Sequence, residues 1–345
     1  MYILPRAVSS VGAALAALPL VLGAPVTPGL APQAAAAQDQ TTLASPQPLP
    51  TAQINGVVWD QTIVGNVVYV VGEFSKARPA GSPKEQNESP RSNAMAYDIT
   101  TGELLDWAPQ LNAAANAIEA SPDGSTLYIG GKFTSVNGQP ASRLAAVDTA
   151  GQHKPLNGGT PGGAVSPNDT VRDLELSPDG STLYMAGLFT QVNDLERLRA
   201  AAVDLKTQQV TNFAPQVDDD SEVRAITVAA DGSAVAIGGS FETVEGSSDA
   251  YGMAILEKDG ALRQTNLTTD IKNAGSMSGI MSLKSDSKGL YGTAYSRQGR
   301  FEGMFRADWS TGDINLMADC HGDTYDVLPA NDVIYISGHT HDCSN

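Results

Sequence analysis

The stretch Ser121–Gly138 reads "SPDGSTLYIGGKFTSVNG", and it returns almost unchanged at Ser177–Asn193 as "SPDGSTLYMAGLFTQVN". The phenylalanine that closes this phrase recurs, 52 to 59 residues apart, at Phe74, Phe133, Phe189 and Phe241. Self-similarity with a period of this size is typical of propellers and solenoids. The repeat therefore defines the architecture, and the variation in its length falls in the loops.

The content of one unit favours the propeller. Residues 171–176, "VRDLEL", alternate apolar and polar side chains, as a half-buried strand does. The Asp-Gly pair in "PDGS" predicts a hairpin turn, and "TLYMAGLF", "RAAAVDL" and "VTNFAP" predict three more strands. No helical spacing interrupts them. We therefore predict an all-β fold, a β-propeller whose blades have four antiparallel strands.

The repeat boundaries predict about five complete blades and a partial sixth, at residues 53–111, 112–163, 164–220, 221–277, 278–323 and 324–345. The sixth unit stops at Asn345 after its first hairpin, whereas closure is what hides the edges of a propeller. We expect either a piece of a longer gene product or an incompletely closed propeller. Residues 40–54 could add one strand beside the last blade.

Small residues and acids recur at fixed places in the units. The second strand carries Gly130-Gly131, Ala186-Gly187 and Gly238-Gly239, which we expect to let backbones approach closely near the axis. The phenylalanine that follows is expected to wedge between blades. The third strand ends in an acid that should accept hydrogen bonds from the next turn, at Asp98, Asp148, Asp204, Glu257 and Asp308. Recurrence in every unit indicates a structural role for these acids.

The first 37 residues have the order of a secretory signal peptide. Arg6 precedes an apolar run at residues 7–26, and small residues lead to a predicted cleavage site after Ala37. Residues 38–52, rich in Pro, Gln, Ala, Ser and Thr, predict a flexible tether. Prolines break the apolar run, and no second run of spanning length follows, so we expect no membrane span. The prediction is a secreted protein, extracellular or associated with the cell surface.

Charge narrows the range of partners. Without residues 1–37 the chain has 20 basic and 38 acidic residues, a net charge of 20 − 38 = −18. Such a chain repels nucleic acid and anionic membranes. We expect a monomer that binds neither of them.

Two phrases carry a resemblance to a known family. "LYIGGKFTSVNGQPASRLAAVDTAG" at Leu127–Gly151 and "DITTGELLDWAPQLN" at Asp98–Asn112 resemble the secreted β-propeller repeat proteins of actinobacteria, of the delta-sixty type. The resemblance covers most of residues 53–345. It implies the fold and a place at the cell surface, and it implies no catalytic residues, because the group is known only as a repeat domain of unknown function.

A weaker resemblance concerns "AYDITTGELLDW" at Ala96–Trp107, which is similar to the tryptophan-docking motif of quinoprotein propellers. Those enzymes bind pyrroloquinoline quinone and oxidise alcohols or sugars. Here the tryptophan lies one residue late, and Phe213 takes its place in the third blade. Packing between blades explains Trp107 as well as a cofactor does.

The end of the chain holds the remaining candidates. Cys320 and Cys343 are the only cysteines, and in an exported protein an even pair predicts a disulfide. His321, His339 and His341, with a nearby aspartate, could hold zinc or copper. The alternative is that the histidines fill structural positions equivalent to Lys132 and Thr134.

Other chemistry has weaker signals. The run Asp218–Asp220 with Glu222 could bind calcium, although a solvated loop between blades explains it better. No nucleophile elbow, phosphate loop or metalloprotease helix motif is present. We therefore expect a binding or scaffolding module for a protein or a glycan, without a cofactor. The alternative is a quinoprotein-like oxidoreductase or a metal-dependent hydrolase.

Overall fold

A computed structural model describes residues 44–45, 47–158, 164–218 and 221–343. This part of the chain is all β, apart from one 3-10 turn at Ser248–Ala250. The predicted signal peptide, residues 1–37, lies outside the described residues. In the part that is described, no helix has the length and apolar character needed to cross a membrane.

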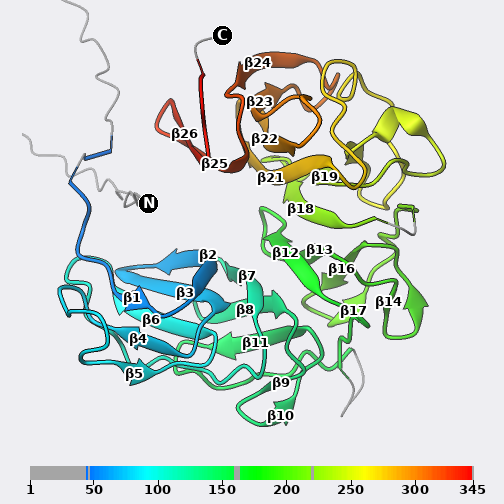
Figure 1. Cartoon of the computed structure of the whole chain (residues 1–345). Helices are drawn as coiled ribbons and strands as arrows, with labels where there is room; N and C mark the ends of the chain where they lie inside the picture. Colours follow the sequence, from blue (N-terminus) through cyan, green and yellow to red (C-terminus); the bar gives the residue numbers. More distant parts are fainter. Residues whose placement is uncertain (1–43, 46, 159–163, 219–220, 344–345) are drawn as a thin grey trace, which may run out of the picture.

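Six antiparallel sheets follow one another along the chain, and we number them as units one to six (Figure 1). Units one and two consist of β2 (Val57–Val64), β3 (Val67–Glu73) and β6 (Ala94–Asp98), and of β7 (Ala115–Ala120), β8 (Thr126–Gly131) and β11 (Leu144–Asp148). Units three and four consist of β12 (Val171–Leu176), β13 (Thr182–Gly187), β16 (Ala200–Asp204) and β17 (Gln209–Val210), and of β18 (Val223–Val228), β19 (Val235–Gly239) and β20 (Met253–Leu256). Units five and six consist of β21 (Ser278–Asp286), β22 (Gly289–Ser296), β23 (Gly303–Ala307) and β24 (Ile314–Asp319), and of β25 (Thr324–Ala330) and β26 (Val333–Gly338).

The first strand of each unit lies on the side that faces the centre in Figure 1, and we call β2, β7, β12, β18, β21 and β25 the inner strands. Each inner strand packs against the next one along the chain. Apolar clusters fill the space between consecutive units, from the first pair to the last. The sheets therefore stand side by side around a common centre, which is a β-propeller-like fold.

The number of strands per unit differs from the prediction of four. Within the described residues, four strands form only in units three and five. In units one, two and four the fourth strand is reduced to one bridge, as between Val147 and His153 in unit two. Pro155, which has no N–H to donate, follows closely there and ends the pairing.

Units two and three carry a small hairpin between their second and third strands that the sequence analysis did not predict. These hairpins are β9 (Ser135–Val136) with β10 (Gln139–Pro140), and β14 (Gln191–Val192) with β15 (Leu195–Glu196). Asn137 and Gly138 turn the first of them with φ of 51° and 75°. Positive φ at both central residues is the turn that matches the twist of paired strands.

In unit one, the segment between the second and third strands forms part of a three-stranded sheet instead of a hairpin. Its β4 (Lys76–Arg78) lies between β5 (Ser89–Pro90) and β1 (Gln53–Ile54). Residues 53–54 thus join the first unit, and the expectation that this segment adds a strand to the last unit is wrong for them. The segment still passes β26, because the Ala44 N–H donates to the Tyr335 hydroxyl at 2.8 Å.

Three of the four recurrent phenylalanines occupy the positions expected of them, whereas Phe74 packs in a cluster formed by the first unit and the segment before it. Phe133, Phe189 and Phe241 are fully buried, each in the apolar cluster between its own unit and the preceding one. Burial of such a side chain contributes roughly 2–3 kcal/mol. The predicted wedge between neighbouring sheets is therefore confirmed.

The paired glycines allow two different close approaches. A Cβ on Gly187 would lie 2.1 Å from the carbonyl oxygen of Thr170 in the same unit. A Cβ on Gly238 would lie 2.7 Å from Cγ2 of Ile280 in the next unit. The expected crowding near the centre is confirmed, and it acts both within a sheet and between sheets.

The acids that end the third strands bind the turns that follow them. Oδ1 of Asp98 accepts the N–H groups of Thr100 and Thr101 at 2.9 and 2.8 Å. These and further bonds from the turn hold the pKa of Asp98 below its usual value. The same arrangement recurs at Asp148, Asp204 and Asp308. Glu257 differs, since it pairs with Arg263 at 2.7 Å.

Candidate functional site

Every inner strand contains a β-bulge near its beginning. The extra residues, which we call the bulge residues, are Trp59, Asn116, Arg172, Arg224, Met281 and Tyr325. A bulge leaves one residue unpaired and re-aims its side chain, and bulges are frequent next to functional sites. The repeat thus offers one re-aimed side chain from each unit at an equivalent place.

Neighbouring bulge residues contact one another's strands. The Asn116 amide donates to the backbone of β12 at 2.8 Å. The Glu222 carboxylate binds the guanidinium groups of Arg172 at 3.1 Å and Arg224 at 2.5 Å. Arg224 in turn lies 3.3 Å from Sδ of Met281. The bulge residues from unit two to unit five therefore form a continuous series at one end of the inner strands, which we call the bulge end.

Just beyond the bulges, charged side chains of the inner strands meet near the centre. We call them the axial cluster: Asp60, Glu119, Asp173, Glu175, Lys284 and Asp326. Lys284 on β21 is coupled electrostatically to carboxylates on β2, β12 and β25, so these side chains share one region. Asp326 is exposed and the other five are half-buried, so all six keep some access to water.

Two aspartates of the axial cluster join neighbouring inner strands. Oδ2 of Asp60 accepts the N–H of Ile118 on β7 at 2.8 Å, and Oδ2 of Asp173 accepts that of Ile226 on β18 at 2.8 Å. The second oxygen of each aspartate accepts the N–H of the next residue in its own strand. These bonds fix both the bulge and the spacing between units.

The environment raises the pKa of several carboxyls in the cluster. Burial is the main cause, and it brings the pKa of Asp60 to about 7, that of Glu119 to about 8 and that of Glu175 to about 7. Repulsion between the carboxylates adds to the rise, and Lys284 opposes it. Carboxyls that titrate near neutrality at the centre of a fold mark a candidate functional site.

Lys284 is the cation of the axial cluster. Burial alone would lower the pKa of its ammonium group, but the carboxylates of Asp173, Glu175 and Asp60 raise it above the usual range. A lysine held in its charged form cannot act as a nucleophile. The cluster can therefore exchange protons through its carboxyls and hold one fixed positive charge.

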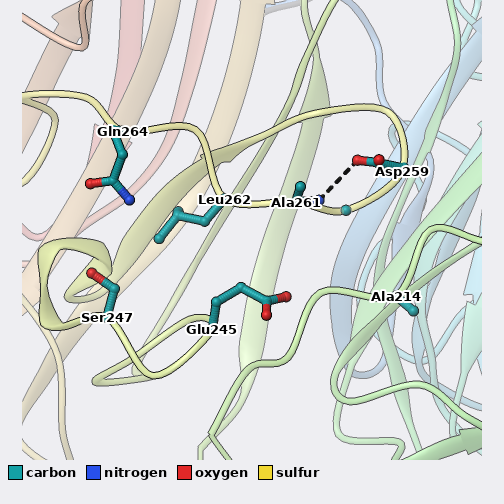
Figure 2. Close-up of a pocket in the computed structure, with 8 residues that line it drawn as sticks. Ala214, Glu245, Ser247, Asp259, Ala261, Leu262 and Gln264 are labelled. Carbon is teal, nitrogen blue, oxygen red and sulfur yellow. Dashed lines mark hydrogen bonds between the residues drawn. The ribbon is translucent and has the colours of Figure 1, made fainter.

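Two shallow notches lie farther out, at the joints between units. The larger, of about 450 Å³, is lined by side chains that include Glu245, Asp259 and Gln264 (Figure 2). The second, of about 440 Å³, lies at the equivalent place two joints earlier in the repeat and is lined by Asp106, Gln110, Asn137 and Gln152 among others. Because the two notches lie at equivalent places, they result from the way in which consecutive units pack together.

The predicted residues near the chain end come together in part. Cys320 and Cys343 form a disulfide, as expected. The rings of His339 and His341 lie 4.7 Å apart, while Nδ1 of His321 is 3.8 Å from Asp319. Among the residues that the structure describes, no three potential ligands gather around a point where a metal ion would fit.

The remaining sequence candidates have structural partners. Trp107 is buried, packs edge-on against Tyr69 at 4.9 Å and donates to the carbonyl of Asp148 at 3.0 Å. Phe213 packs in the same way against Tyr184. Trp107 is therefore a packing residue between units.

Of the acidic residues that could bind calcium, the structure describes only Asp218 and Glu222. Asp218 accepts the N–H groups of Glu242 and Thr243, and Glu222 is bound by two arginines. Asp219 and Asp220 lie outside the described residues, so the calcium hypothesis can be examined only at its two ends. Both ends already have partners within the chain.

The sequence analysis missed the axial cluster and the bulge residues. Their signal is a carboxylate or arginine that recurs within the first strand of a unit, as in "VWDQT", "AIEAS" and "VRDLEL". From the alternation in "VRDLEL" we predicted only a half-buried strand and assigned no role to its polar face. The structure turns it toward the centre.

Comparisons with known proteins bear on the fold. No protein-family model matches this chain, and a search of curated proteins found no match. Solved structures do match, among them hydrazine synthase of Kuenenia stuttgartiensis, which is 13% identical, covers 83% of this chain and 74% of that chain, and has a TM-score of 0.53. A similarity at this identity shows a shared all-β architecture and carries no activity over to this chain.

Proposed function

We propose that this protein is a secreted β-propeller that acts as a binding module, with its binding surface at the bulge end of the inner strands. In this proposal the six units are successive blades; among the described residues the first five have three or four strands each and the sixth has two. Residues 1–37 direct export, and the order of charged, apolar and small residues there supports this. The disulfide Cys320–Cys343 is consistent with an oxidising compartment.

One observation carries the choice of surface. The bulges recur in every unit, whereas the side chains that they present vary: a tryptophan, an asparagine, two arginines, a methionine and a tyrosine. Trp59 and Tyr325 are 55% and 49% exposed, although large aromatic side chains are usually buried. Exposed aromatic groups on a rigid frame that also presents arginines are typical of a recognition surface.

A protein partner is favoured over a glycan. Tryptophan, tyrosine and arginine are the residues that dominate the binding energy of protein interfaces. Arg172 and Arg224 are already held in place by Glu222, so binding would not have to order them. Preorganisation of this kind reduces the entropic cost of association.

The proposal is tested by selecting ligands directly on this surface. A phage library of random 12-residue peptides is panned on the wild-type protein, and the peptides obtained are compared on a Trp59→Ala/Tyr325→Ala variant. We expect selected peptides to lose at least tenfold in affinity on this variant and to be unaffected by Leu195→Ala, which removes an exposed side chain elsewhere. Equal binding to all three proteins would overturn the choice of surface. Binding only on a glycan array, lost in the double variant, would replace the protein partner with a glycan.

A further inference from the structure

The residue that directly follows the bulge is of two kinds. It is an aspartate in units one, three and six, and a small residue in units two, four and five. These residues are Asp60, Asp173 and Asp326, and Ala117, Ala225 and Ser282. Each aspartate therefore has a neighbouring unit whose side chain at this place is small, which leaves the carboxylate room to reach across.

The aspartates join the units in pairs. Asp60 of unit one accepts the N–H of Ile118 in unit two, and Asp173 of unit three accepts that of Ile226 in unit four, both at 2.8 Å. In the last pair, a serine hydroxyl of unit five donates to the aspartate of unit six at 2.7 Å. We call an aspartate that binds the N–H of the next unit a clamp.

The Asp60 clamp uses both oxygens of its carboxylate. Oδ2 accepts the N–H of Ile118 at 2.8 Å, and Oδ1 accepts the N–H of Gln61 at 2.7 Å. Gln61 lies two residues after the bulge residue Trp59, so one bond holds the bulge and the other holds its distance from unit two. A protonated carboxyl carries a hydrogen on one oxygen, and that oxygen becomes a donor. The protonated acid cannot keep both bonds.

The surroundings of Asp60 determine the pH at which it takes up a proton. Of the two strands that pack most closely on β2, β3 places an apolar residue opposite Asp60 and β7 contributes Glu119. Across the centre, Lys284 favours the ionised form, whereas Asp173 and Glu175 repel it. Burial has the largest effect and raises the pKa of Asp60 to about 7. The carboxyl therefore changes its charge in the neutral range.

We propose that the Asp60 clamp is a pH-sensitive switch, in which uptake of a proton by its carboxylate releases one of the two backbone bonds and frees the bulge that presents Trp59. Both N–H bonds favour the ionised carboxylate, so by linkage the protonated form binds these groups more weakly. The clamp is closed above about pH 7 and open below it. The switch depends only on these bonds, and its effect on binding rests also on the function proposed for the bulge end.

Opening of the clamp should lower the affinity of the bulge end. Trp59 is 55% exposed, and once its bulge is free a partner has to order it on binding. For a group with a pKa of about 7, the ionised fraction falls about tenfold between pH 8 and pH 6, and the apparent affinity follows the fraction of competent protein. The protein thus holds its partner in a mildly alkaline medium and releases it in a mildly acidic one.

The switch is tested without a ligand by fluorine NMR of protein labelled with fluorotryptophan. The chain has three tryptophans, and Trp59→Phe identifies the signal of Trp59. We expect this signal to shift with a midpoint near pH 7, while the signals of the other two tryptophans move less. Asp60→Asn has a single acceptor oxygen, like the protonated acid, and should hold the Trp59 signal near its acid position at every pH.

Asp173→Asn is the matched control. Asp173 forms the equivalent clamp to unit four, and its charge raises the pKa of Asp60. In this variant the Trp59 signal should still shift, with its midpoint at a lower pH. A Trp59 signal that does not change between about pH 5.5 and pH 8.5, or that shifts equally in Asp60→Asn, would overturn the proposal.

A second measurement needs no variant. Hydrogen exchange at Ile118 of the wild type, corrected for the intrinsic effect of pH and compared with the amides of β8, should be faster at about pH 6 than at about pH 8. An equal rate at both pH values would mean that the clamp stays closed, and the proposal would be wrong.

The effect on binding is measured with a histidine-free peptide selected on the bulge end. Its affinity for the wild type should fall about three- to tenfold from pH 8 to pH 6, and it should stay at the lower value in Asp60→Asn. A Trp59 transition without any change in affinity would refute the link between the switch and binding. Failure to select any peptide would count against the proposed function, and the fluorine signal would still decide whether the switch exists.

Discussion

Glu119 gives the sharpest test of the axial cluster. Its carboxyl lies on β7 among other carboxylates, and its pKa rises from 4.5 to about 8, first through burial and then through repulsion from Glu175. The folded protein therefore holds this proton more tightly than the unfolded chain. Folding is linked to proton uptake between pH 4.5 and about 8, and the free energy of unfolding falls as the pH rises through this window.

The magnitude follows from the size of the pKa change. At about 1.36 kcal/mol for each pKa unit, a rise from 4.5 to about 8 corresponds to about 5 kcal/mol. Glu119 is only half-buried, and water reduces the electrostatic part of this penalty. We expect about 2 kcal/mol to be lost between roughly pH 5 and pH 8.5. Glu119→Gln resembles the protonated acid and removes this loss.

The assay is urea unfolding of the wild type and Glu119→Gln between about pH 5 and pH 9. The two unfolding free energies should agree at the acid end, and the variant should be more stable by about 2 kcal/mol at the alkaline end. Glu196→Gln, which alters an exposed acid on β15, serves as the control and should follow the wild type. A difference between Glu119→Gln and wild type that is constant with pH would refute the argument from burial.

Two further predictions concern the frame that carries the site. Phe189→Ala empties a fully buried position between units two and three, and it should cost about 3–5 kcal/mol in chemical unfolding; a cost below about 1 kcal/mol would mean that the units do not pack there. The double change Cys320→Ser/Cys343→Ser opens a loop between residues 23 positions apart, and it should lower stability by about 3 kcal/mol. Hydrogen exchange should locate that loss in β25 and β26, and a loss spread evenly over all six units would contradict this.

The strands of the repeat could be predicted because they depend on local chemistry. "TLYMAGLF" is apolar, aromatic and bounded by turn residues, and it became β13 at the expected place. The aspartates that end four of the third strands were assigned correctly because each binds a turn two to four residues away, whereas Glu257 pairs with Arg263. Asn137-Gly138 carried an equally local signal for the extra hairpin in unit two, and that signal was overlooked.

The candidate site could not be predicted in the same way. A strand such as "VRDLEL" has the same alternation whether its polar face meets bulk water or the centre of a ring of sheets. Only the meeting of β12 with β21 and β2 brings Glu175, Lys284 and Asp60 into one region. The bulges could not be predicted from the sequence for a related reason. Arg172 is the extra residue only because Val171 and Asp173 pair with adjacent residues of β13.

The repeat itself separates residues that build the fold from residues that are free to bind. A side chain required for folding should recur in unit after unit, as the wedge phenylalanine and the acid of the third strand do. The bulge position is fixed in its backbone and accessible, yet it holds tryptophan, asparagine, arginine, methionine or tyrosine in different units. If packing governed this position, similar environments would have selected similar residues. A constant backbone that carries variable side chains is what a recognition surface requires, because each unit can then contribute a different contact without altering the frame.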